Sequence, residues 1–304
     1  MYLKHYLEQL DYKNLPGFLI KYLETPSLLR LKKVGYFCGM DYASKDIYDF
    51  REYISRYDHS LTVSLIVYKL TKDKKATLAG LFHDIATPCF SHVIDYMNED
   101  YEKQESTEEY TEEILKQDDY LKKYLKEDHI NIDDITNFKK YSIVDNDRPK
   151  LCADRIDGII LTGIGWTKNI DLKDIELIVN DMRVFKNETG EDEIGFKTSS
   201  IAEKVLEVNR SIDIYCHSNE DNYMMQLLAK ITKLAIDKNY IFYDELYYFN
   251  EDELFNLLKR IKDEELERLI FRFENIKRLD IPILELPKIK KRKLNPIASE
   301  TRLK

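Results

Sequence analysis

The stretch LAGLFHDIATPCFSH, residues 78–92, determines how the rest of the chain is interpreted. It places His83 and Asp84 side by side at the end of an apolar helical run, and His92 follows after a turn. Adjacent residues on a helix point about 100° apart, so this pair can converge on one ion only where the helix ends. Pro88 indicates that the helix does end there. The pair is therefore predicted to supply two ligands of a metal site.

Two further residues are candidates for the other half. His59 begins the apolar helix HSLTVSLIVYKLT, residues 59–71, and a short connection makes the next helix, 74–84, antiparallel to it. The start of one helix then lies beside the end of the other. Asp154 lies in RPKLCADRIDGIILTGIG, residues 148–165, a predicted buried helix in which an unpaired carboxylate would be costly. Taken singly, a lone histidine or a helical aspartate is more often structural than a ligand, so both interpretations stay open here.

The composition favours a mostly helical globular protein. The chain has 304 residues, of which only 9 are glycine and 7 are proline, with 34% charged and 43% hydrophobic residues. The net charge of −9 argues against a broad nucleic-acid-binding surface. The cysteines form no C-x-x-C pair, which suits reduced thiols in the cytoplasm: Cys38, Cys89, Cys152 and Cys216. We also expect no signal peptide, because the first residues lack an apolar core, and no membrane span, because no apolar run approaches the necessary length.

The pattern along the chain predicts one large helical domain over residues 1–275, with its motif core at about 25–165. The only good β-hairpin candidate is 181–197, two short apolar runs around a polar turn that contains glycine. Two long helices are expected near 199–217 and 220–238. Residues 276–304 turn basic, and we interpret them as a solvated edge strand, a tail or an oligomer contact.

Three ordered segments resemble the H…HD…D signature of the HD superfamily of metal-dependent phosphohydrolases: RYDHSL (56–61), HDIATPCFSH (83–92) and ADRID (153–157). The likeness is closest to the branch that contains the dNTP triphosphohydrolases, where a segment similar to TPSLLRLKKV (25–34) precedes the first histidine. The resemblance implies an all-α HD-domain helical bundle that binds one divalent ion, such as Fe, Mn, Mg or Zn. The implied ligands are His59, His83, Asp84 and Asp154.

The resemblance also implies substrate-binding and catalytic residues. Arg56 matches an arginine of the family and could hold a phosphate through its planar guanidinium, although a surface salt bridge is an equal alternative. His92 and Asp95, spaced i, i+3, match a His–acid pair that works at the scissile phosphate. The competing interpretation is a helix-capping histidine beside a solvated aspartate.

The chain departs from the triphosphohydrolase pattern at several positions. Thr87 stands where those relatives carry another histidine, and Thr107–Glu108 stands where they carry a His–Glu pair. Gly158 follows Asp157 where they have tyrosine, and the segment 213–223, DIYCHSNEDNY, is acidic where they place basic residues on the triphosphate. The resemblance therefore carries over the metal centre and not the triphosphohydrolase activity.

We accordingly predict a metal-dependent phosphohydrolase that acts on a nucleotide or small phosphate ester. The alternative is a catalytically degenerate HD module that binds a nucleotide or a protein partner in a regulatory role. A nucleic-acid protein that uses the basic C-terminal residues is the least favoured hypothesis at this net charge. Self-association into homo-oligomers is an expectation from the resemblance only.

Overall fold

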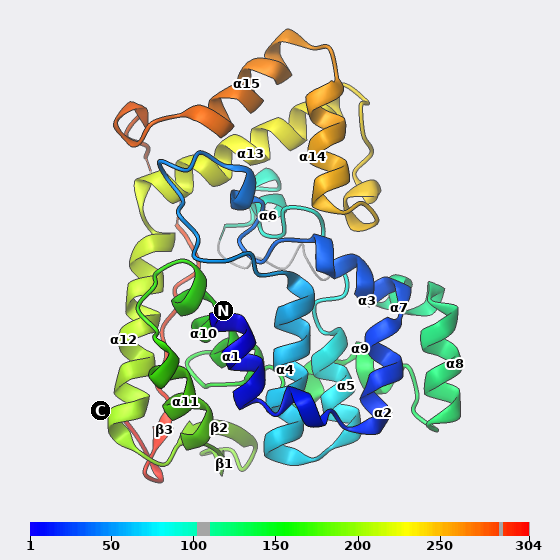
Figure 1. Ribbon diagram of the computed structural model, residues 1–304, viewed down its shortest axis with the longest axis vertical. Helices are drawn as coiled ribbons and strands as arrows, with labels where there is room; N and C mark the ends of the chain where they lie inside the picture. Colours follow the sequence, from blue (N-terminus) through cyan, green and yellow to red (C-terminus); the bar gives the residue numbers. More distant parts are fainter. Residues whose placement is uncertain (102–109, 286–287, 304) are drawn as a thin grey trace.

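The computed structural model describes residues 1–101, 110–285 and 288–303, and these residues form a mostly α-helical protein with one small sheet (Figure 1). The predicted fold class is confirmed. The α-helices of the described residues are α1 (Tyr2–Gln9), α2 (Gly17–Ile20), α3 (Pro26–Arg30), α4 (Arg56–Thr71), α5 (Lys74–Phe82), α6 (Val93–Met97), α7 (Thr111–Gln117), α8 (Asp119–Glu127), α9 (Asp133–Thr136), α10 (Ala153–Gly165), α11 (Leu172–Asp181), α12 (Ser199–Cys216), α13 (Asn219–Asp237), α14 (Glu251–Arg260) and α15 (Glu264–Asn275).

Helices α4, α5 and α10 form the centre of the fold. The helix α4 begins with a capping box in which Ser55 and Asp58 exchange side-chain and backbone hydrogen bonds. It ends at Lys72, which adopts a left-handed conformation, and Asp73 at once caps the start of α5. This tight connection makes α4 and α5 the antiparallel pair that the sequence predicts. Helix α4 is buried on nearly all faces over residues 56–67, so its polar residues lie inside the protein.

Helix α10 begins later than the sequence analysis predicts. The predicted start was residue 148, whereas the structure begins the helix at Ala153 after an extended Cys152. The physical reason is Pro149, which disfavours the helical region for Arg148 and lacks a backbone N–H. As a result, residues 145–152 form a loop, and Asp154 lies in the first turn of the helix rather than in its middle.

The predicted hairpin is confirmed as β1 (Met182–Lys186) and β2 (Asp192–Phe196), which pair antiparallel. Two further short strands, β3 (Ile297–Ala298) and β4 (Thr301–Arg302), extend it to a four-stranded sheet within the described residues, in the order β1-β2-β3-β4. Strand β3 runs parallel to β2 and antiparallel to β4. Figure 1 shows the sheet at one end of the molecule and α13, α14 and α15 at the other.

The C-terminal segment, residues 288–303, packs against the folded body instead of lying free in solvent. An edge strand is one of the interpretations predicted for this segment, but the structure gives residues 288–296 no regular structure, and strands begin only at Ile297. Arg302 anchors the segment through two hydrogen bonds of 2.9 Å to the buried Glu193 carboxylate on β2. A buried carboxylate needs such a partner, so this ion pair explains why the segment returns to the sheet.

No helix among the described residues is both long enough and apolar enough to cross a membrane.

Candidate metal centre and pocket

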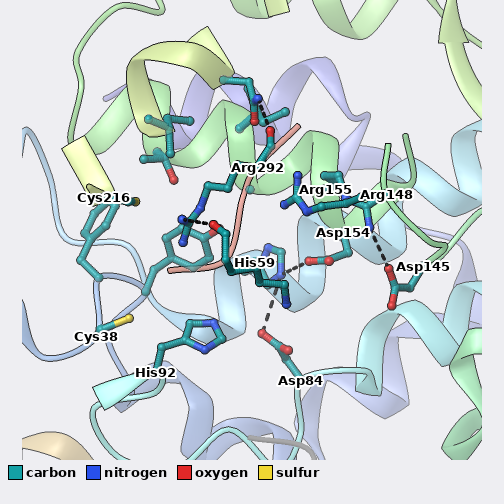
Figure 2. Close-up of a pocket in the computed structure, with 18 of the residues that line it drawn as sticks. Cys38, His59, Asp84, His92, Asp145, Arg148, Asp154, Arg155, Cys216 and Arg292 are labelled. Carbon is teal, nitrogen blue, oxygen red and sulfur yellow. Dashed lines mark hydrogen bonds and ion pairs between the residues drawn. The ribbon is translucent and has the colours of Figure 1, made fainter. Parts of the chain in front are cut away.

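The four predicted metal ligands come from the ends of the three central helices. His59 lies in the first turn of α4, His83 is the residue on which α5 ends, Asp84 follows it, and Asp154 lies in the first turn of α10. Because α5 ends at His83, the next residue can turn toward the same point as the histidine. The structure thus brings these four residues together, and Figure 2 labels three of them, His59, Asp84 and Asp154.

The distances within this group suit a metal ion. His59 Nε2 lies 3.1 Å from Asp154 Oδ1, and His83 Nε2 lies 3.6 Å from the same oxygen. One ligand atom from each of these three residues lies within 4.8 Å of the other two. Ligand atoms about 2.1 Å from a shared ion are about 3.0 to 3.5 Å apart in octahedral or tetrahedral geometry. His59, His83 and Asp154 could therefore hold one ion with little movement.

His83 provides an independent test of this interpretation. Its Nδ1–H donates to the Gly80 carbonyl at 2.8 Å, which leaves Nε2 to face the site. Burial lowers the pKa of His83, but the charge of Asp84 and the nearby Asp154 prevail and raise it, so Nε2 holds a proton that a metal ion would replace. That Nε2 atom is buried and has no hydrogen-bond partner in the described part of the chain. It lies 3.6 Å from one oxygen each of Asp84 and Asp154. A buried ring nitrogen that faces two carboxylates without a hydrogen bond is an arrangement that a bound cation satisfies, because the cation replaces the proton on the nitrogen and binds both carboxylates.

Asp84 is shared between the histidines and an arginine. Its Oδ2 atom lies 3.7 Å from His59 Nε2 and accepts a hydrogen bond from Arg56 Nη1 at 2.8 Å. Burial opposes ionisation of Asp84, but the charges of His83, Arg56 and His59 outweigh it and lower the pKa of Asp84 to about 2. Asp84 is thus held as a carboxylate, which is the form a metal ligand needs.

Arg56 does not form the surface salt bridge that was its alternative interpretation. It is buried, its Nε donates to the Ser91 hydroxyl at 3.2 Å, and its guanidinium lies 5.0 Å from the ring centre of Tyr36. Its ion-pair partner is the candidate ligand Asp84. Arg56 is therefore a part of the site, where a positive charge can reach both a ligand and a bound anion.

His59 is held by a second aspartate that the sequence analysis did not assign. His59 Nδ1 lies 2.7 Å from Asp157 Oδ2, and the Tyr6 hydroxyl donates to the other oxygen of the same carboxylate at 2.6 Å. Burial lowers the pKa of His59, but its hydrogen bonds to Asp154 and Asp157 prevail and raise it to about 10. A metal ion would replace the proton on Nε2 while Asp157 keeps the one on Nδ1. The i, i+3 spacing of Asp154 and Asp157 on α10 was the sequence signal for this residue.

His92 and Asp95 meet as their spacing predicts. His92 Nδ1 lies 2.8 Å from Asp95 Oδ2, and the Asp95 side chain is fully buried. His92 occupies the N-cap position of α6, but its side chain makes no capping hydrogen bond. The competing interpretation of a capping histidine beside a solvated aspartate is therefore wrong. The His92 side chain is 33% exposed, so a ligand in the pocket can reach it.

These residues line one cavity of about 760 Å³, large enough for a nucleotide-sized ligand. One part of its wall is apolar and aromatic: Met40, Tyr48, Phe50, Trp166, Ile212 and Met225. Another part is strongly basic, with side chains from the loop before α10, from α10 itself and from the C-terminal segment: Arg148, Lys150, Arg155, Lys290 and Arg292. The sequence analysis missed this basic wall, because the acidic segment 213–223 suggested that cationic groups were lacking.

Thr87 does not line this cavity. It is buried, and its backbone carbonyl accepts a hydrogen bond from Arg30 at 2.6 Å. The other departure from the triphosphohydrolase pattern, Thr107–Glu108, lies outside the described residues.

Comparison with known proteins agrees with the geometry of the site. Residues 56–159 match the family model of the HD domain. The matched HD domain begins at Arg56 and includes His59, His83, Asp84 and Asp154. The chain is also similar to the uncharacterized protein YdhJ of Bacillus subtilis (strain 168), with 27% identity over 226 residues. That alignment covers 71% of this chain and 65% of the relative, a little less than two thirds of its length.

The contact between His59 and Asp157 predicts an effect on metal affinity. In the Asp157→Asn variant the side chain has one acceptor oxygen and one NH₂ group in place of two acceptor oxygens. Its two ends can therefore no longer accept hydrogen bonds from both His59 and Tyr6. We expect Mn²⁺ to bind about 10- to 100-fold more weakly, as titration calorimetry would measure. Tyr6→Phe is the matched control, because it removes the other hydrogen bond to the same carboxylate and should change Mn²⁺ affinity by less than about threefold. Equal affinity of Asp157→Asn and wild type would contradict the role of Asp157.

Asp221 in the pocket wall predicts a pH dependence of stability. Burial raises the pKa of Asp221 from 3.8 to about 7, against the opposing hydrogen bond from the Tyr48 hydroxyl at 2.6 Å. Between these values the folded protein binds a proton that the unfolded chain does not, so raising the pH lowers the free energy of unfolding. Asp221→Asn keeps an acceptor for Tyr48 and lacks this titration.

We therefore expect the stability of Asp221→Asn relative to wild type to increase by about 2 to 4 kcal/mol from pH 4 to pH 7.5. Urea unfolding of the metal-free proteins at both pH values measures this difference. A difference that stays constant with pH would show that Asp221 is already ionised in the folded protein at pH 4.

Proposed function

We propose that this protein is a metal-dependent phosphohydrolase that acts on a nucleotide or another small phosphate ester. The observation that supports this most directly is His83 Nε2, a buried ring nitrogen without a hydrogen bond that faces Asp84 and Asp154. A cation at this point would have His59 as a further ligand. The site lies in the wall of a cavity of about 760 Å³. The HD domain match over residues 56–159 supports the same class of reaction.

In this proposal His59, His83, Asp84 and Asp154 hold one divalent ion. When bound, the ion lowers the pKa of a water molecule and offsets negative charge on phosphate oxygens. Two carboxylates and two imidazoles leave positions open for water and substrate, and they suit Fe, Mn, Zn or a similar ion.

The residues around the ion have distinct tasks. Arg56, held by Asp84 and Ser91, orients a phosphate oxygen through its planar guanidinium. His92 exchanges a proton with the substrate through Nε2, because Asp95 fixes the proton on its Nδ1. Asp157 keeps His59 in the tautomer that points Nε2 at the ion. Triphosphate hydrolysis is not part of this proposal, because Thr87 supplies no proton donor to the cavity.

A second function is favoured by that same absence: an HD domain that binds a nucleotide and regulates without turnover. Thr87 is buried outside the cavity, so fewer acid–base groups face a ligand than the triphosphohydrolase pattern contains. Ligand-induced thermal stabilisation without product formation would support this function. Metal-dependent product formation would support the enzyme.

The metal centre is tested by removing His83. We expect the wild type to retain about one equivalent of a divalent metal and to release phosphate from at least one nucleotide or small phosphoester, a release that EDTA abolishes. His83→Ala should lose the metal and reduce phosphate release at least about 100-fold. His129→Ala removes an exposed histidine that does not line the cavity, so metal content and phosphate release should both stay unchanged. Metal content by elemental analysis together with a phosphate-release assay decides the matter. Wild-type protein that holds no metal at any tested concentration would refute the proposal.

The role of His92 is tested separately from metal binding. His92→Gln removes the proton-exchanging group and should lower kcat about 10²- to 10⁴-fold while the metal content stays equal to that of wild type. The variant should also lose the limb of the pH–rate profile that His92 generates. If kcat and the pH profile were unchanged, His92 would have a structural task only.

A further inference from the structure

The irregular residues 288–296 are held at the cavity by backbone contacts on different sides. The Lys290 N–H donates to the Tyr101 carbonyl at 3.1 Å, and the Asn209 side chain donates to the Arg292 carbonyl at 2.7 Å. The Asn295 N–H donates to the carbonyl of Pro149, next to Arg148, at 2.9 Å. Lys290 and Arg292 consequently line the cavity. Their neighbours Lys291 and Lys293 are exposed.

Arg148 joins them from the loop before α10. Its Nη1 atom is buried and has no hydrogen-bond partner among the described residues. A buried guanidinium nitrogen without an acceptor is rare in folded proteins, because the lost hydration costs free energy that nothing returns. This atom therefore points to an anionic acceptor that occupies the cavity when the protein is at work.

The three cations are close enough to repel one another. Burial, followed by the charges of Arg155 and Arg292, lowers the pKa of Arg148 to about 10. Burial, followed by the charges of Arg148 and Arg292, also lowers the pKa of Lys290. Asp154 and Asp95 act on Lys290 in the opposite direction, which places it within electrostatic reach of both the metal centre and the His92 pair. Such a cluster of like charges is costly unless an anion relieves it.

The carboxylates in the cavity are largely engaged elsewhere. Asp145 pairs with Arg155 at 3.4 Å, Glu191 with Lys150 at 3.0 Å and Asp84 with Arg56 at 2.8 Å. Within the described ranges, neither the Arg148 nor the Arg292 guanidinium forms an ion pair with a carboxylate within 4.0 Å. Arg292 Nη1 donates to the Lys290 carbonyl at 3.4 Å, and the Arg292 backbone N–H donates to Asp213 Oδ1 at 3.3 Å. Burial lowers the pKa of Arg292, but the nearby Cys216, Asp221 and Asp213 prevail and raise it. Burial also raises the pKa of Asp221 to about 7, which weakens its negative charge near neutral pH. Asp147, next to Arg148 in the chain, also lines the cavity and is outside these pairs. The basic wall still has more cations than carboxylates, with Arg148, Lys150, Arg155, Lys290 and Arg292 against Asp145, Asp147 and Glu191.

We propose that Arg148, Lys290 and Arg292 form a second anion subsite, which binds a phosphoryl group of the ligand other than the one at the metal centre. This inference deepens the proposed function and rests on it for the identity of the ligand. The guanidinium groups of Arg148 and Arg292 match phosphate oxygens as planar forks, and Lys290 adds a point charge in the same cavity wall. Figure 2 shows Arg292 and Arg148 across the pocket from Asp84 and His92. The C-terminal segment is therefore a part of the substrate site and selects ligands that carry two separated anionic groups.

The test uses the full-length protein without metal, so that only protein cations can bind an anion. Inorganic phosphate at low ionic strength is the probe, and the fluorescence of Trp166, the single tryptophan, which lines the same cavity, is the signal. We expect Arg148→Gln and Arg292→Gln each to weaken phosphate binding about tenfold. Lys291→Gln and Lys293→Gln remove the same charge from exposed positions of the same segment and should change binding by less than about twofold.

Equal phosphate binding by Arg148→Gln, Arg292→Gln and Lys291→Gln would overturn the subsite, as would a wild type that binds no phosphate. Arg148→Gln should fold normally, because the buried Nη1 makes no hydrogen bond that the change could remove. The Arg148→Gln variant therefore decides the test even if Arg292→Gln fails to fold. The two proposals can fail separately. If the protein has no metal and no turnover, Arg148→Gln and Arg292→Gln can still bind phosphate more weakly than wild type. If the protein is an active enzyme, these variants can still bind phosphate as well as wild type does.

Discussion

The hydrogen-bonded imidazole of His59 is the interaction on which the rest of this structure depends. Asp157 lies on one side of the ring at 2.7 Å and Asp154 on the other at 3.1 Å, and both come from α10. Asp157 is fully buried and Asp154 is partly exposed, and two carboxylates so close on one helix are stabilised by positive charge between them. This interaction holds α10 against α4, and α5 then brings His83 and Asp84 to the same point. The packing of three helices and the chemistry of the site therefore have one common cause.

Around this centre the cavity combines three different environments. The ligand atoms of His59, His83 and Asp154 favour a cation, whereas the wall formed by Arg148 and the C-terminal segment favours an anion. The third wall is aromatic and offers stacking and apolar area. A molecule that fits all three carries at least one phosphate near the ion, further negative charge and a flat or apolar part. Nucleotides have this combination of properties, which is why a nucleotide heads the proposed substrates.

The sequence predicted those features that depend on local patterns. His83 and Asp84 were identified because Pro88 marks the end of their helix, and the antiparallel pair α4–α5 followed from the short connection between two apolar runs. Asp157 was missed although its i, i+3 spacing from Asp154 was visible, because nothing local shows which polar group a buried histidine will face. The positions of Lys290 and Arg292 were not predictable: residues 288–296 have no periodicity, and their path is set by contacts with Pro149, Asn209 and Glu193 that lie far away in the chain.

The anchoring of Arg302 on Glu193 has a practical consequence for work with this protein. The strands that follow Arg292 pair with β2, and together with the contacts of Lys290, Arg292 and Asn295 they hold Arg292 at the cavity. A purification tag fused after residue 304 would disturb the contact between Arg302 and Glu193, and a truncation that removes the last strands would abolish it. Either change would displace Arg292 while the candidate metal ligands stayed in place. Such a preparation would look well folded and bind metal, yet report the wrong substrate preference. A histidine tag would add competing imidazoles. An N-terminal, cleavable tag without histidines is therefore the appropriate design for functional assays.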